Sequence, residues 1–442
     1  MTRVLRSILN STLISITILI FSSPNGSALN IQEVETHYGT NAWLVENSTV
    51  PIIAVEIAFR GGANLDPPLL DGVANMVSEM LDEGAGNLNA GQFQAQLANL
   101  AIKFSSRVQR ESFRVSFKTL KENREAAFKL VGLALTQPHF SSESIEKIRL
   151  QLLSERERAS SDLNWIVDDL WRQTAFPSQP YGRSILGTAA SINSITAAHL
   201  SDFAKTQFTT ENLVVSVAGD ITALELKRLL DVALSGLALT SSPAPDNKVL
   251  SISTGATVVS LQESSQSIIR FGLSALKRSD PDFFAAYVMN IILGGNSFTS
   301  RLHHEIREKR GIAYSVYTYL QTFEESGLLV GHVACANGKV SNAIELIIGE
   351  LDRLTLEQVP QDELNAAKAY LIGSYPLALS SNARIAGALT RIQLDNLGIR
   401  YLEHRSKKIE AVSVADVQRV AKRLIDTQGL IIAIAGNPPV ID

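Results

Sequence analysis

A long-range internal repeat constrains the fold of this chain more strongly than any other feature of its sequence. The apolar run Asn212–Asp220 closes on Gly219, and Gly429–Asn437 repeats the pattern 217 positions later, at Gly436. A second match involves two alternating runs that each lead to an Asp-Pro pair. Val55–Phe59 leads to Asp66-Pro67, and Ile268–Leu273 leads to Asp280-Pro281, 214 positions later. Two matching intervals indicate a duplicated unit of about 200 residues.

The rhythm of apolar residues within each unit predicts its fold class. Arg114–Leu120 alternates like a strand, whereas Glu122–Leu135 and Ser144–Arg158 have helical spacing. This order predicts an α+β fold of two homologous domains, each an antiparallel sheet covered by helices on one face. We place the domains at residues 31–236 and 250–442. A linker at 237–249 separates them, because Ser241–Asn247 is polar, contains proline and lacks periodicity.

Residues 1–28 have the composition of a secretory signal peptide. Arg3 and Arg6 precede the apolar run Leu13–Phe21, and small residues end the segment at Gly26-Ser27-Ala28. We predict cleavage after Ala28 and a periplasmic location; an uncleaved membrane anchor is the alternative. No other apolar stretch approaches the ~20 residues of a transmembrane helix, so we expect no membrane association after cleavage.

Charge and cysteine content argue against other classes of function. The formal net charge of −4 creates no overall field that would attract nucleic acid. Cys335 is the single cysteine, so an intrachain disulfide is impossible. It ends the apolar run Gly327–Cys335, and we interpret it as a small core residue. His332 lies three positions away, on the opposite face of a strand, and cannot activate this thiol.

Several segments are similar to the pitrilysin (insulinase) family of zinc peptidases, which includes the mitochondrial processing peptidase. Pro180–Thr188 resembles a family segment of the first domain. Ser300–Leu302 and Arg307–Tyr317 resemble the signature of the second domain. The resemblance extends over nearly the whole chain after the signal peptide, and it implies the same two-domain fold.

The resemblance also implies where a zinc site would lie. Catalytic members carry His-x-x-Glu-His on a helix, with a further glutamate ligand downstream. The corresponding helix here is Leu69–Leu81, in which Asn75 and Glu79 stand at the histidine positions and Ser78 at that of the base; Glu155 matches the downstream ligand. An amide is a poor zinc ligand, and a hydroxyl without its own base is a poor proton acceptor. We therefore expect no metal and no cofactor in this chain.

Other metal sites find little support in the sequence. A weak hard-cation site formed by Glu79 and Glu155 is an alternative, but we favour a solvated polar helix face at these positions. The seven histidines include no two at the spacing of metal ligands.

Arg307 and Tyr314 match the family residues that contact substrate. The resemblance implies that the matching pair reaches a catalytic zinc site, binds the substrate backbone and stabilises the oxyanion. Guanidinium and phenol groups suit this role because both donate hydrogen bonds to a carbonyl oxygen that gains charge. The alternative is a solvated helix end at Arg307 and an ordinary half-buried strand residue at Tyr314.

These features predict a non-catalytic, substrate-binding subunit of a heterodimeric zinc metalloendopeptidase. The resemblance implies a homologous partner that keeps the intact motif and holds the zinc, with unfolded peptides as substrates. A peptide-binding or structural scaffold with no peptidase role is the second hypothesis. An autonomous peptidase with an unrecognised site is the third and least favoured.

Overall fold

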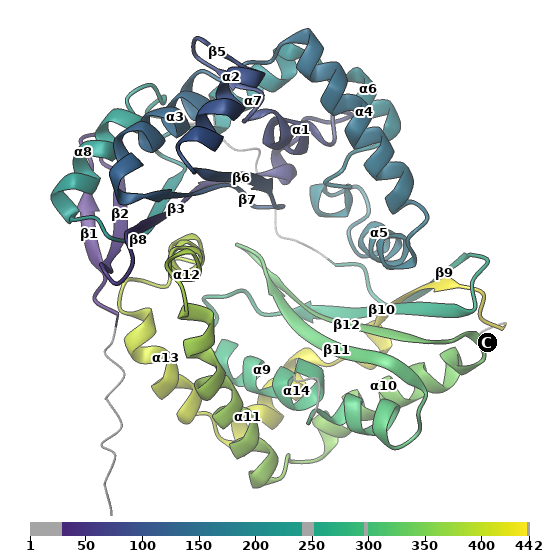
Figure 1. The fold of residues 1–442 in the computed structure, drawn as a ribbon. Coiled ribbons are helices and arrows are strands. Elements are labelled where there is room, and N and C mark those ends of the chain that lie inside the picture. Colours follow the sequence, from purple (N-terminus) through teal and green to yellow (C-terminus); the bar gives the residue numbers. More distant parts are fainter. Residues whose placement is uncertain (1–28, 241–251, 296–298, 440–442) are drawn as a thin grey trace, which may run out of the picture.

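The computed structural model describes residues 29–240, 252–295 and 299–439 (Figure 1). The predicted signal peptide, residues 1–28, lies outside the described residues. So do residues 241–249 of the predicted linker. Backbone N–H groups of Thr210 and Glu211 donate to the carbonyls of Ala238 (2.9 Å) and Leu239 (3.2 Å), which attaches these residues to the first half. The domain boundaries at 31–236 and 250–442 stay a prediction.

Two sheets with the same strand order form the framework of the fold. The first contains, in spatial order, β1 (Gln32–Glu35), β2 (Asn41–Glu46), β8 (Leu213–Gly219), β3 (Ile52–Arg60), β7 (Ser112–Leu120) and β6 (Lys103–Val108). The second contains β9 (Ala256–Leu261), β13 (Ile431–Gly436), β10 (Gln266–Ala275), β12 (Gly327–Ala336) and β11 (Ala313–Thr322). Strand for strand, β2-β8-β3-β7-β6 matches β9-β13-β10-β12-β11. This correspondence confirms the duplication that the repeat predicts.

The sheets are antiparallel except for one pair in each. β2 runs parallel to β8, and β9 runs parallel to β13. A parallel pair needs a long crossover connection, and in both halves the strands and helices that lie between the two strands in sequence supply it. The α+β prediction is thus confirmed, with one parallel pair per sheet where the sequence predicts a fully antiparallel arrangement.

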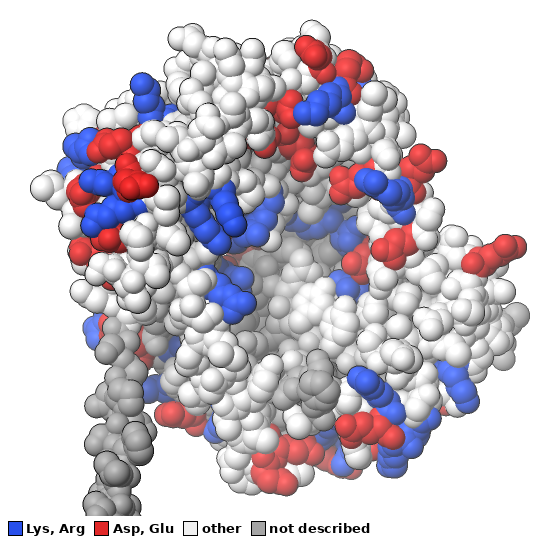
Figure 2. All heavy atoms as spheres, viewed as in Figure 1, with Lys and Arg blue, Asp and Glu red and all other residues white. Residues whose placement is uncertain are grey.

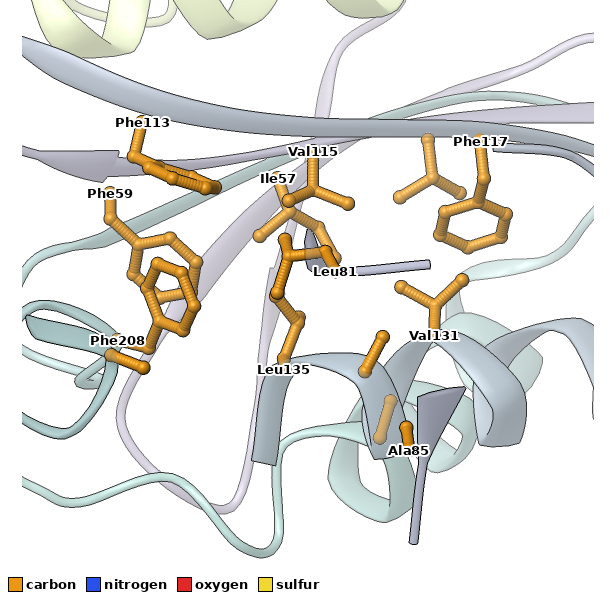
Figure 3. Packing of buried hydrophobic residues seen from close by; sticks show 14 of the residues in the cluster. Ile57, Phe59, Leu81, Ala85, Phe113, Val115, Phe117, Val131, Leu135 and Phe208 are labelled. Atoms are coloured by element: carbon orange, nitrogen blue, oxygen red, sulfur yellow. The ribbon is translucent and has the colours of Figure 1, made fainter. Parts of the chain in front are cut away.

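Helices cover the outer face of each sheet (Figure 1). Those of the first half are α1 (Val73–Met80), α2 (Ala90–Asn99), α3 (Arg124–Thr136), α4 (Ser142–Ala159), α6 (Ala189–Ser194), α7 (Ala197–Gln207) and α8 (Ala223–Ala233). Those of the second are α9 (Phe283–Asn290), α10 (Val340–Leu356), α11 (Gln361–Ser374), α13 (Tyr401–Glu410) and α14 (Val414–Leu424). Separate apolar cores fill the two interfaces. In the first core, Phe208 packs against Phe59 and Phe113, with ring centroids 4.7 and 4.9 Å apart (Figure 3).

The inner face of each sheet is covered by a helix from the other half. α5 (Leu163–Ala175) lies on the second sheet, and α12 (Asn382–Leu394) lies on the first (Figure 1). Trp171 of α5 belongs to one apolar cluster with Val330 and Ile431. Leu389 of α12 belongs to another with Trp43. This reciprocal exchange adds a second covered face to each sheet, so β3 is buried along almost its whole length.

Within the part of the chain that is described, no helix combines the length and the apolar character needed to cross a bilayer.

Candidate functional site

The helix that carries the degenerate motif begins later than the sequence predicts. α1 starts at Val73, not at Leu69, and Leu69 is 86% exposed with a left-handed backbone (φ 68°). The reason is a cap formed by the Asp66 carboxylate, which accepts hydrogen bonds from the N–H groups of Gly72 (2.7 Å) and Ala74 (2.9 Å). These are among the N–H groups that lack partners at a helix start. Leu69 therefore lies outside the buried stripe of this helix.

Three of the four motif positions lie on α1 and the fourth lies on the neighbouring helix α4. Glu79 is half-buried on α1, and Glu155 is exposed on α4. Burial raises the pKa of Glu79, and the negative charges of Glu155 and Asp82 raise it further. Asn75 is half-buried, whereas the Ser78 hydroxyl is buried and has no hydrogen-bond partner among the described residues. Glu79 and Glu155 thus lie on neighbouring helices and interact electrostatically.

This set of side chains does not fit zinc. It offers one amide, one hydroxyl and two carboxylates, but no imidazole or thiolate, which together with carboxylates are the usual zinc ligands. Across the described ranges, no group of three or more His, Cys, Asp or Glu side chains is arranged to hold a metal ion. We therefore derive no catalytic step through a metal in this chain.

Arg307 lies in a π-helical turn, η5 (His303–Glu308), beyond which the chain reverses. Gly311 follows the turn with a left-handed backbone (φ 59°), and it donates its N–H to the carbonyl of Arg307 at 3.0 Å. The Arg307 side chain is exposed, and its Nη1 lies 3.3 Å from Nε2 of the buried His303. Single π-turns often occur at functional sites.

Tyr314 occupies a β-bulge at the start of β11. Ala313 pairs with Cys335 and Ser315 with the adjacent Ala334, so Tyr314 is the extra residue of the strand. A bulge redirects a side chain relative to the pleat, and the Tyr314 side chain is 83% exposed. Tyr314 is therefore not an ordinary half-buried strand residue. Within the described ranges, no hydrogen bond, ion pair or ring contact joins Tyr314 or Arg307 to the motif positions on α1 and α4.

The sequence did not predict a cavity of about 740 Å³ that lies between the two halves. Its wall comprises α5, the β6–β7 turn, β10, the β11–β12 turn and the end of α12. Lys and Arg side chains gather around a central hollow in the view of Figure 2. Arg307 and Tyr314 do not line the cavity, and the motif positions on α1 and α4 do not line it either. No sequence pattern could have identified it, because its wall combines short polar segments from both halves.

The chain matches two family models in sequence. Residues 42–189 match the one described as insulinase (peptidase family M16), and residues 194–371 match the one described as peptidase M16 inactive domain.

Relatives align over most of the chain. A Helicobacter pylori protein named non-peptidase homolog YmxG is 26% identical over 437 residues, 96% of this chain and 98% of that protein. The mitochondrial-processing peptidase subunit beta of Dictyostelium discoideum is 24% identical over 388 residues, 85% of this chain and 82% of that protein. A crystal structure described as a peptidase M16 inactive domain from Pseudomonas fluorescens has a TM-score of 0.86 at 25% identity, and the match covers 94% of this chain and 100% of that one.

Proposed function

The chain belongs to the insulinase (M16) family of peptidases, and we propose that it is the non-catalytic, substrate-binding subunit of a heterodimeric zinc metalloendopeptidase. In this proposal a homologous partner with an intact His-x-x-Glu-His motif holds the zinc. This chain supplies Arg307 and Tyr314 to the partner's site, where they bind an unfolded peptide. The complex works in the periplasm, after removal of the predicted signal peptide.

The observation that carries the proposal is the exposure of Tyr314 on its bulge. A tyrosine that is 83% exposed contributes little to the core of this chain, and its ring and hydroxyl are accessible to another molecule. Arg307 is exposed seven positions earlier, and its guanidinium Nη1 lies 3.3 Å from Nε2 of His303. Both groups keep donors for a peptide carbonyl oxygen, and such bonds strengthen as the oxygen becomes an oxyanion.

Two further observations support the assignment. The α1 positions of this chain do not fit zinc, so catalysis by the family mechanism requires metal from elsewhere. One relative is named as a subunit of a processing peptidase, which is consistent with action in a complex.

The test combines this chain with a zinc-binding homologue from the same organism. We expect a stable complex on size-exclusion chromatography and cleavage of a fluorogenic peptide only in the mixture. Arg307→Ala should lower turnover by roughly 100-fold, the loss typical of removing one oxyanion donor. Arg310→Ala is the matched control, because Arg310 is a neighbouring exposed arginine paired with Glu305.

The outcomes separate the hypotheses. Unchanged turnover in Arg307→Ala, with the complex intact, would refute the role of this arginine. Peptide binding without cleavage in any mixture would favour the scaffold hypothesis. Stoichiometric zinc and cleavage by the purified chain alone would establish an autonomous peptidase instead.

A further inference from the structure

Arg110, in the wall of the inter-half cavity, has few hydrogen-bond partners of its own. Its Nη1 donates one hydrogen bond, to the backbone carbonyl of Arg183 at 3.0 Å. No carboxylate in the described ranges forms an ion pair with it. A guanidinium has five N–H donors, so this group has spare capacity for an anion.

Three other arginines in the wall are paired with acids. Arg114 lies 3.2 Å from Glu56, Arg172 lies 3.3 Å from Asp169, and Arg270 lies 3.1 Å from Asp168. Burial, followed by the positive charge of Arg172, lowers the pKa of Arg110 to about 9, and the negative charge of Asp169 offsets part of this shift. A partly buried cation without a counter-ion is unfavourable, and a bound anion would remove that cost.

The backbone holds Arg110 firmly in place. The β6–β7 turn that carries it is bonded to the segment after β3: Gly61 N–H donates to Glu111 O, and Asn64 N–H donates to Arg110 O, both at 3.0 Å. Arg60, at the end of β3, also lines the cavity and has only neutral partners, the carbonyls of Gln393 and Leu394 and the side chain of Asn396. Arg60 therefore caps the carbonyl groups at the C-terminal end of α12, and it adds a second positive charge to the cavity wall.

Two acids in the wall, Glu111 and Asp395, are engaged by hydrogen bonds or disfavoured as anions. Glu111 accepts hydrogen bonds from the Tyr181 hydroxyl and from the N–H of Glu324 (3.1 Å), and burial raises its pKa. Burial also raises the pKa of Asp395. Neither of them forms an ion pair with Arg110. The wall also presents aromatic side chains, among them Trp165 and Tyr319, which offer apolar contact to a ligand.

We propose that the inter-half cavity binds a carboxylate of an acidic peptide segment, with Arg110 as the group that contacts it. A guanidinium binds a carboxylate through two parallel hydrogen bonds. The cavity lies within the ~300–1,000 Å³ range of ligand sites, enough for a few residues of an extended peptide. For the peptide nature of the ligand, this inference rests on the proposed function.

The test measures peptide binding to the full chain alone by fluorescence anisotropy. Two labelled peptides are compared. They differ at two positions only, both of which are Glu in the first peptide and Gln in the second. We expect the wild-type chain to prefer the Glu peptide by roughly ten-fold, the effect of one charge-assisted hydrogen bond. Arg110→Gln should abolish the preference, and Arg110→Lys should retain part of it. Arg228→Gln is the control, because it removes the same charge from an exposed site on α8.

Equal binding of the two peptides by the wild type, or an unchanged preference in Arg110→Gln, would overturn the proposal. An equal loss of affinity for both peptides in Arg110→Gln, together with a lower melting temperature, would also overturn the proposal, because Arg110 would then have a structural role. Displacement of the Glu peptide by an equal concentration of free glutamate would indicate a small carboxylate ligand and reject the peptide class. Because no partner and no turnover enter this assay, its failure is distinguishable from failure of the proposed function.

Discussion

Asp66 caps the start of α1, and the protonation of its carboxyl group makes the stability of the fold depend on pH. Burial raises the pKa of its carboxyl to about 7, although bonds from Ala74 and Gly72 and the charge of Arg183 favour the ionised form. In the unfolded chain the group ionises near 3.8. The folded chain therefore holds one proton more between these two values, and this group makes stability fall as the pH rises through that window.

The check on Asp66 compares urea unfolding of wild type and Asp66→Asn at about pH 4 and about pH 7. The variant lacks the titrating carboxyl, so the stability advantage of wild type over variant should shrink as the pH rises. Parallel pH profiles would show that Asp66 does not titrate differently in the folded state.

Cys335 is confirmed as a buried residue, with 3% exposure. Burial raises the pKa of its thiol to about 11, so little thiolate exists near neutral pH. We expect a thiol-specific reagent to leave the native chain unmodified and to modify one thiol per chain in denaturant. Rapid stoichiometric reaction of the native chain would contradict the burial.

His332 lies on the opposite face of β12 from Cys335. Its Nε2 is 3.0 Å from Oδ1 of Asn164 on α5, within hydrogen-bond distance.

Among the elements, α5 makes the clearest link between the halves. Trp171 is 1% exposed and donates its Nε1–H to the carbonyl of Ile431 at 3.1 Å. Its ring fills the space beside Gly272, where an added Cβ would come within 2.5 Å of Cζ2. This contact explains a glycine in the middle of the central strand β10.

Trp171→Ala should destabilise the chain by about 3–5 kcal/mol, the usual cost of removing a large buried aromatic side chain. Chemical denaturation measures the loss. Leu150→Ala on α4 is the control, because Leu150 is 66% exposed, and its effect should stay within about 0.5 kcal/mol. A similarly small effect for Trp171→Ala would mean that α5 does not anchor on the second sheet.

At the scale of the whole molecule, the exchange of α5 and α12 makes the two halves one folding unit. Each half alone is long enough to bury a core. Separation would nevertheless expose the apolar inner face of both sheets and the buried side of both helices.

We expect residues 29–240 and 252–439, produced separately, to aggregate or to lack a cooperative thermal transition. Produced together, they should co-purify in equal amounts. Circular dichroism melting and size-exclusion chromatography report both outcomes. A cooperative transition in either fragment alone would show that the exchanged helices are not required for folding.

Local patterns allowed much of the fold and part of the site to be predicted. Strand alternation identified β3, β7 and β10, and residue identity alone showed that Asn75 and Ser78 are poor replacements for a zinc ligand and a base. The predicted start of α1 at Leu69 was wrong, because this apolar residue matches the helical period. The true start depends on the Asp66 cap, a contact between side chain and backbone that periodicity does not reveal. The bulge at Tyr314 was not predicted, because it depends on the register against β12.

The sequence by itself determined the duplication, the α+β class, the family and the lack of zinc ligands, since each depends on residue identity or on spacing along the chain. The tertiary structure decided the exchange of helices between halves, the direction of Tyr314 and the cavity beside Arg110. These depend on contacts such as Trp171 with Ile431 and Arg60 with Leu394, between residues hundreds of positions apart. Such contacts form only when two separately patterned halves pack together, and periodicity within either half carries no record of that packing.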